Sequence, residues 1–150
     1  MRVQTIPPQP VLYFRTETTI RELGRFAYTV AEKLYAEALR QEQLPAGPIH
    51  WLYYGCTGEP DQRFTLEIAL PLVEMPGAGS GFEGKELPSF SCVTREHTGR
   101  WEEMTTTYGS IFQWMATEGH RPSGVFREVY LHLHPGYQVT EIQVGIEEGL

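Results

Sequence analysis

The chain has 150 residues and a formal net charge of −7, with 12 Lys and Arg against 19 Asp and Glu. The length predicts a single domain over residues 1–150, while the acidic balance without a Lys/Arg cluster argues against a nucleic-acid-binding surface. No apolar run could form a signal core or span a membrane, and Cys56 and Cys92 match no zinc spacing, so we expect a cytoplasmic protein with two reduced thiols.

The first part of the chain predicts a strand followed by a long helix. Residues 1–10 hold three prolines and predict an extended arm, and residues 11–18 alternate as a strand does. Thr19 and Glu22 have the spacing of a capping box, in which the hydroxyl and the carboxylate satisfy free amides at a helix start. Apolar residues then recur at helical spacing, and we expect this helix to end near Gln43.

Two strands and a glycine-rich stretch follow this helix. Residues 49–56 and 63–73 are predicted to be strands, and residues 75–86 are predicted to be a flexible linker. The linker matches most of a phosphate-binding loop, but Glu86 takes the place of the magnesium-binding Ser or Thr, and a strand rather than a helix is expected next. Nucleotide binding is therefore not predicted, and no cofactor is expected.

The remaining chain repeats the same order of elements. Residues 87–96 predict a strand, residues 99–119 a helix, and residues 124–134 and 138–146 two more strands. The second helix carries a row of apolar and aromatic side chains that predicts a buried face. Three aromatic residues are assigned to the core on this basis: Tyr35 in the first helix, and Tyr108 and Phe112 in the second.

The strand over residues 124–134 is the most informative stretch. Side chains alternate between the faces of a strand, so Glu128 shares one face with Phe126 and Tyr130. If this face is enclosed, the carboxylate needs a partner, because a buried unpaired charge is costly. A cationic ligand could be that partner. If Glu128 instead lies on a solvated sheet face, no functional role is expected for it.

The two halves align with each other. At a constant offset from the Pro-Gly breaks, Trp51 aligns with Glu128 and Tyr53 with Tyr130. The predicted fold is α+β, with two repeated strand-helix-strand-strand units, about 11–74 and 87–148, in one curved antiparallel sheet. Because Leu52 and Val129 belong to aliphatic rows, we expect those rows to face the two helices and a ligand pocket to lie on the other face.

The chain resembles the GyrI-like small-molecule-binding domain, which is also the effector-binding module of AraC- and MerR-type multidrug regulators. The resemblance covers about residues 11–146 and rests most on the Glu-x-Tyr strand after a helix and a Gly/Pro break. The matching residues are His97 to Glu102, Tyr108, Ile111, Trp114, Arg127 to Tyr130 and Thr140 to Ile142. The chain departs from the family at Gly99-Arg100-Trp101, where Gly-Pro-Tyr is frequent, and residues 1–10 are not expected to supply a helix-turn-helix.

This resemblance implies a stand-alone binding protein for hydrophobic, often cationic aromatic small molecules. The carboxylate that meets cationic compounds falls on Glu128, with stacking faces supplied by Trp51, Tyr53, Trp101, Phe126 and Tyr130. No nucleic-acid or membrane partner is expected.

Two other functions stay open. The first is hydrolysis of reactive cyclopropane-bearing toxins, with Glu128 as general acid or base and Tyr130, Tyr53 or Glu67 holding the water. The second is an acidic protein inhibitor that binds through its surface. His132 and His134 could join Glu128 in a metal site, but as the end of a strand before the Pro135-Gly136 turn they are expected to be exposed, so no metal is predicted.

Overall fold

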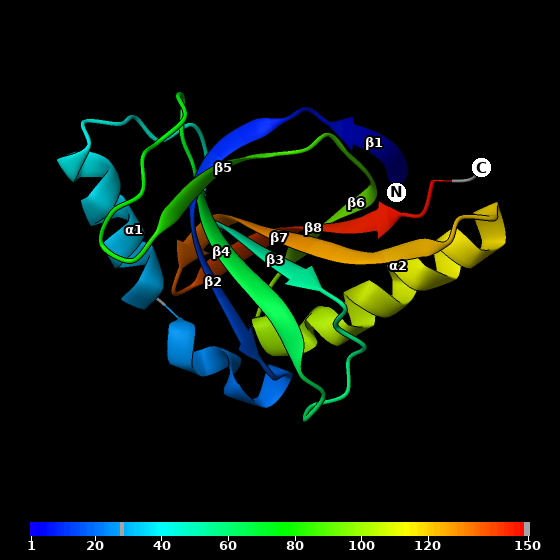
Figure 1. Cartoon of the computed structure of the whole chain (residues 1–150). Coiled ribbons are helices and arrows are strands. Elements are labelled where there is room, and N and C mark those ends of the chain that lie inside the picture. The colour runs from blue at the N-terminus through cyan, green and yellow to red at the C-terminus, as the bar shows by residue number, and fades with distance from the viewer. Residues whose placement is uncertain (28, 149–150) are drawn as a thin grey trace.

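The structure, a computed structural model, describes residues 1–27 and 29–148 (Figure 1). Within these residues, eight strands and two α-helices account for most of the chain, and two short 3₁₀ helices precede the α-helices. The elements are β1 Arg2–Ile6, β2 Gln9–Thr18, η1 Ile20–Phe26, α1 Thr29–Arg40, β3 His50–Tyr54, β4 Phe64–Pro71, β5 Glu83–Leu87, β6 Phe90–Thr98, η2 Trp101–Glu103, α2 Met104–Glu118, β7 Pro122–His134 and β8 Tyr137–Ile146.

All eight strands form one antiparallel sheet in the order β1-β6-β8-β7-β3-β4-β2-β5. Two strand-helix-strand-strand units, one ending in β3 and β4 and the other in β7 and β8, meet where β3 pairs with β7. Figure 1 shows the strong curl of the sheet, with α1 and α2 on different sides of the picture. The predicted fold class, α+β with two repeated units in one curved antiparallel sheet, is confirmed.

The β3–β7 pairing sets the register at the centre of the sheet. Trp51 lies directly opposite Glu128, and Tyr53 lies opposite Phe126. Both pairs come from the rows that the alignment of the two halves placed on one face. Since directly opposed side chains in an antiparallel pair are neighbours on the same face, Trp51 and Glu128 approach each other as predicted.

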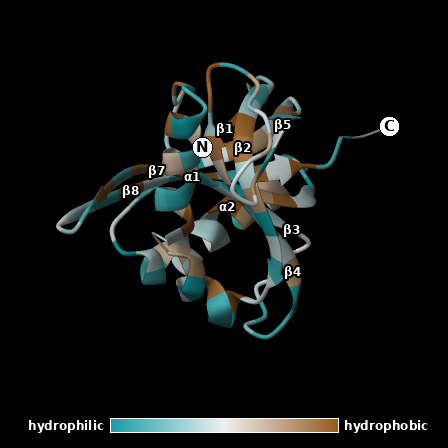
Figure 2. Cartoon of the chain, turned by 60° about the vertical axis from the view of Figure 1, so that its left-hand side comes forward, coloured by the Kyte–Doolittle hydropathy of each residue, from teal (hydrophilic) through white to brown (hydrophobic). Residues whose placement is uncertain are grey.

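The helices cover the face that carries Glu128, so the predicted placement of the pocket on the face away from the helices is wrong. Val30 and Leu34 of α1 pack in one cluster with Ile49 and Tyr53 of the Glu128 face. In Figure 2 the helical ribbons alternate between hydrophobic and hydrophilic stretches, as expected for helices that bury one side. The aliphatic row is buried instead by the curl of the sheet, which packs Leu52 against residues of β2, β4 and β5.

The predicted first helix is interrupted. It divides into η1 and α1, because Ala27 has an extended conformation with φ −59° and ψ 129°. The capping box is wrong, since Thr19 makes no side-chain cap hydrogen bond and the Glu22 carboxylate contacts the guanidinium of Arg25 at 3.4 Å. The second helix follows the prediction more closely and ends at Gly119, which has a φ of 79°, a conformation that favours glycine at a helix C-terminus.

Both stretches predicted to lack regular structure contribute strands. Part of the N-terminal arm forms β1, which pairs with β6, and the end of the glycine-rich stretch forms β5, which pairs with β2. The rest of that stretch is attached to the C-terminal end of α1 and the residue after it, because Ser80 donates a hydrogen bond to Glu37 at 2.6 Å and Gln41 bonds both backbone groups of Gly77. The glycine-rich stretch, predicted to be a flexible linker, is therefore fixed to the end of α1 by polar contacts.

Candidate ligand-binding pocket

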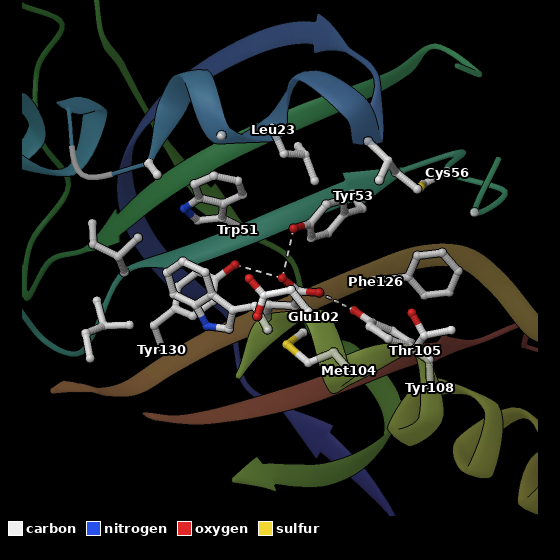
Figure 3. Close-up of a pocket in the computed structure, with 18 of the residues that line it drawn as sticks. Leu23, Trp51, Tyr53, Cys56, Glu102, Met104, Thr105, Tyr108, Phe126 and Tyr130 are labelled. Atoms are coloured by element: carbon white, nitrogen blue, oxygen red, sulfur yellow. Dashed lines mark hydrogen bonds between the residues drawn. The ribbon is translucent and has the colours of Figure 1, made fainter. Parts of the chain in front are cut away.

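A cavity of about 900 Å³ lies between the helix-covered face of the sheet and the helical segments (Figure 3). Strands β3 and β7 supply its sheet side, η1 and α1 border it in the first half, and η2 and α2 border it in the second. Most wall residues are apolar or aromatic, as in other small-molecule sites. The aromatic wall residues are Tyr35, Trp51, Tyr53, Trp101, Tyr108, Phe112, Phe126 and Tyr130.

The Glu128 carboxylate is the polar centre of this cavity. Its residue is only 7% exposed, and its two oxygens accept hydrogen bonds from three phenol groups. Tyr53 and Tyr130 donate to Oε1 at 2.8 and 2.7 Å, and Tyr108 donates to Oε2 at 2.6 Å. Figure 3 shows these bonds as dashed lines that converge on one carboxylate. The three tyrosines come from β3, β7 and α2, so the carboxylate joins the two halves of the fold.

Burial dominates the electrostatics of this cluster. It raises the pKa of Glu128 above its ordinary value, and the hydrogen bonds from Tyr108, Tyr130 and Tyr53, followed by attraction to His97, oppose this shift by stabilising the charged form. Burial, followed by repulsion from Glu128, raises the pKa of all three tyrosines well above 10.0. The phenols therefore remain neutral donors.

No cationic side chain balances this carboxylate in the pocket. Among the described residues that form its wall, the only charged side chains are Glu128 and Glu102, and none is Lys, Arg or His. Three neutral hydrogen bonds satisfy the acceptor sites of Glu128, and the only cationic influence on its pKa is a weaker attraction from His97, which lies outside the wall and makes no ion pair with it. The site is therefore suited to a ligand that brings a positive charge.

Most of the aromatic rings around Glu128 meet edge to face or tilted, and one pair is stacked: the rings of Tyr108 and Phe112 lie 6.2 Å apart at 25°. Trp51 and Tyr130 have ring centroids 5.9 Å apart at 88°, and Trp101 lies 5.7 Å from Tyr130 at 57°. On the other side of the carboxylate, Phe126 lies 6.1 Å from Tyr108 at 77°. These contacts form a cage that presents both ring faces and ring edges to the cavity.

The structure brings together all six residues that sequence reasoning proposed for ligand binding. Each of them lines the cavity: Trp51, Tyr53, Trp101, Phe126, Glu128 and Tyr130.

Three further wall residues were assigned to the core from helical spacing. Tyr35 and Phe112 are 44% and 37% exposed and border the cavity, so their assignment to the core is wrong. Tyr108 also lines the cavity and donates the shortest of the three hydrogen bonds to Glu128. A signal for Tyr108 was present in the sequence, because a phenol hydroxyl in an apolar row needs a hydrogen-bond partner.

Two other residues considered in the sequence, Glu67 and Cys92, lie away from the pocket. Glu67 is fully buried on the opposite face of the sheet, where it accepts hydrogen bonds from Lys85 and Tyr54, so it is not available to hold a water beside Glu128. Cys92 is buried, whereas Cys56 borders the cavity, and burial raises the pKa of its thiol.

The two histidines of β7 do not continue the Glu128 face. A register irregularity between Tyr130 and His132 changes the alternation, so Leu133 rather than a histidine lines the cavity. His132 and His134 are exposed. Over residues 1–27 and 29–148, no cluster of three His, Cys, Asp or Glu side chains is placed to hold a metal ion, and no helix is long and apolar enough to cross a membrane.

Comparisons with known proteins identify a family model and several solved structures that match this chain. The model of the GyrI-like small molecule binding domain matches residues 1–147, and no curated protein sequence matches significantly. The crystal structure of the EcmrR C-terminal domain has a TM-score of 0.80 at 16% identity, covering 99% of this chain and 97% of that one. In the EcmrR–DNA complex the match has a TM-score of 0.79 and covers 57% of the EcmrR chain.

Two further solved structures share the fold. SAV2435 bound to tetraphenylphosphonium has a TM-score of 0.63 at 14% identity, over 97% of this chain and 93% of that one. A hydrolase from Listeria innocua has a TM-score of 0.65 at 15% identity, over 97% and 90% of the two chains.

Proposed function

The chain belongs to the GyrI-like small molecule binding domain family, and we propose that it binds hydrophobic, cationic aromatic small molecules in the pocket around Glu128. The observation that carries this proposal is a buried carboxylate with three phenol donors and no cationic side chain in a cavity of about 900 Å³. SAV2435, which shares the fold, is bound to the aromatic cation tetraphenylphosphonium. We also propose that this domain binds small molecules rather than nucleic acid, supported by its net charge of −7.

The physical basis is charge compensation in a medium of low polarity. A carboxylate in an apolar cavity attracts a delocalised cation more strongly than a carboxylate in water does. The faces of Trp51, Trp101 and Tyr130 add cation–π attraction and apolar contact area. Neither contribution needs a directional hydrogen bond to the ligand, so the pocket is expected to accept cations of different shapes.

The direct test is a fluorescence titration with a flat cationic dye and a neutral analogue of the same shape. We expect the cation to bind about tenfold or more tightly than the neutral analogue, because only the cation compensates the charge of Glu128. Equal affinity for the two compounds would contradict the proposal, as would the absence of binding by either.

Cation affinity is expected to fall as the solution becomes more acidic. Burial raises the pKa of Glu128 above 4.5 in the free protein, and a bound cation lowers it again by stabilising the carboxylate. Binding therefore releases a proton near the free-state pKa, so affinity rises with pH through that range and is constant above it.

Calorimetry in two buffers of different ionisation enthalpy, repeated across the acidic range, would measure this proton release. The tyrosines that contact Glu128 do not contribute, because their pKa values are raised far above that range. The neutral analogue is the control and should show no proton release. A cation affinity that does not change with pH would show that the ligand does not meet an ionisable Glu128.

Catalysis in the same pocket is a second candidate function. It is favoured by the raised pKa of Glu128, which suits a general acid or base, and by the fold shared with proteins from Listeria innocua that are named as hydrolases.

The reaction would be hydrolysis of a strained cyclopropane ring, with a tyrosine hydroxyl positioning the water. Mass spectrometry of a cyclopropane-bearing alkylator after incubation would detect the addition of one water. If the protein neither binds the dye nor converts the alkylator, a function through a protein partner is favoured instead.

A further inference from the structure

The pocket contains a second carboxylate in a different environment. Glu102, in η2, is exposed and lines the same cavity as the buried Glu128. Its neighbour Glu103 contacts the guanidinium of Arg100 at 3.3 Å, whereas Glu102 makes no hydrogen bond or ion pair with the described residues. Figure 3 shows Glu102 among the side chains that surround the pocket. The cavity thus has two carboxylates, and neither forms an ion pair with the described residues.

Aromatic contacts connect the two carboxylates. The hydroxyl of Tyr130 donates to Glu128, the ring of Tyr130 contacts the ring of Trp101, and Glu102 is the next residue in the chain. Glu128 is almost inaccessible at the sheet, while Glu102 lies at the solvent-exposed border of the cavity. A ligand leaving Glu128 along these rings would therefore reach Glu102 as it approaches solvent.

A second, smaller hollow adjoins the pocket at the same place. Its volume is about 400 Å³, and Trp101 and Glu102 line both cavities. Tyr137, which is 55% exposed, supplies an aromatic ring to the second hollow. Arg100 also borders this hollow, but its guanidinium contacts Glu103. The shared border therefore combines a carboxylate with aromatic rings, the pairing that favours an alkylammonium group.

We propose that Glu102 is a specificity-determining residue that selects elongated dications, with an aromatic cationic head at Glu128 and a second positive charge at Glu102. The inference rests on the proposed binding function and defines its ligand class more narrowly. A monocation at Glu128 leaves the charge of Glu102 uncompensated, whereas a second cation on a flexible chain pairs with it and lies against Trp101 and Tyr137. Because Glu102 is exposed, this contact adds modest affinity and is weakened by salt.

The test uses phenanthridinium dyes with alkyl chains of increasing length. In one series the chain ends in a trimethylammonium group, and in the other it ends in a tert-butyl group of the same shape without charge. At the best chain length the charged tip is expected to tighten binding to the wild-type protein about fivefold over the neutral tip. In Glu102→Gln this advantage should disappear, and in Glu102→Lys the charged tip should bind more weakly than the neutral one.

Glu118→Gln is the matched control, because it removes an exposed carboxylate of the same charge at the far end of α2, outside the cavity wall. This control should keep the fivefold advantage. No advantage of the charged tip at any chain length, or an advantage that survives in Glu102→Gln, would overturn the inference. Failure of the underlying function would look different, since the dyes with the neutral tip would then not bind even to the wild-type protein.

Discussion

Glu128→Gln is expected to weaken binding of a cationic aromatic dye about 30-fold, while the affinity for a neutral analogue of the same shape stays unchanged. A contact between a cation and a buried, hydrogen-bonded carboxylate is worth about 2 kcal/mol more than the same contact with a neutral amide. The apolar and aromatic contacts remain in the variant and account for the binding of the neutral compound. Fluorescence titration of both compounds against both proteins measures the difference.

The substitution is expected to preserve the fold. An amide oxygen in place of Oε1 can accept from Tyr53 and Tyr130, as the carboxylate does, and the amide nitrogen can donate to the hydroxyl oxygen of Tyr108. The free energy of unfolding near neutral pH should not fall, because burial already disfavours the charged form of Glu128. Chemical denaturation of the variant is therefore the control for the binding result, and an unchanged dye affinity would remove Glu128 from its assigned role.

The same variant separates the functions that the family and the fold allow. In a binding module, cation affinity falls and nothing else changes. In a hydrolase, turnover of the strained-ring compound is lost while neutral ligands still bind, because the general acid or base is gone. For a protein inhibitor that acts through its surface, a buried residue that is 7% exposed makes no contact with the partner, so partner binding stays the same.

The centre of the fold was predictable because it depends on alternation and on the internal repeat. Side chains in β3 and β7 alternate strictly where they pair, so aligning Trp51 with Glu128 was sufficient to place them together. The edge strands were not predictable in the same way. Both β1 and β5 form in stretches rich in proline or glycine, and they depend on pairing with distant strands rather than on their own sequence.

The face covered by the helices could not be predicted from alternation. Residues of both rows of β7 are buried near the middle of the strand, because a strongly curled sheet buries both faces. The aliphatic row containing Leu52 therefore looked suited to packing under helices, although the aromatic row fills that position. Tyr108 was missed for a related reason, because helical spacing identifies an inward-facing residue without showing whether it meets the core or a cavity.

The second large effect is expected on the opposite face, where Lys85→Met should lower the free energy of unfolding by about 2 kcal/mol. The ammonium of Lys85 lies 2.7 Å from both oxygens of Glu67, whose side chain is 1% exposed. Without Lys85, the buried carboxylate keeps direct contacts with the hydroxyl of Tyr54 and the exposed guanidinium of Arg15 at 3.5 Å, and a longer-range attraction to Arg127. The expected loss is below that of a fully buried pair because the Lys85 side chain is 31% exposed.

Thermal and chemical denaturation of Lys85→Met would measure this loss, with a fall in melting temperature of roughly 4–8 °C for a chain of this size. Lys33→Met, at an exposed position of α1, is the control and should change stability little. Adding Glu67→Gln to Lys85→Met should recover part of the loss, because the double variant no longer buries an unpaired charge. Equal destabilisation of the double and single variants would show that packing, not charge, is the cause.

Dye affinity should not change in Lys85→Met, and this expectation links stability to function. Two of the buried glutamates lie on opposite faces of the sheet: Glu67 in β4 and Glu128 in β7, the two strands that pair with β3. Glu67 has a lysine and an arginine of the protein as partners, so its charge is compensated permanently. Glu128 accepts hydrogen bonds from neutral phenols, forms no ion pair and faces a cavity, so under the proposed function a cationic ligand compensates its charge. A dye affinity that fell with Lys85→Met would contradict this division between a structural and a ligand-binding carboxylate.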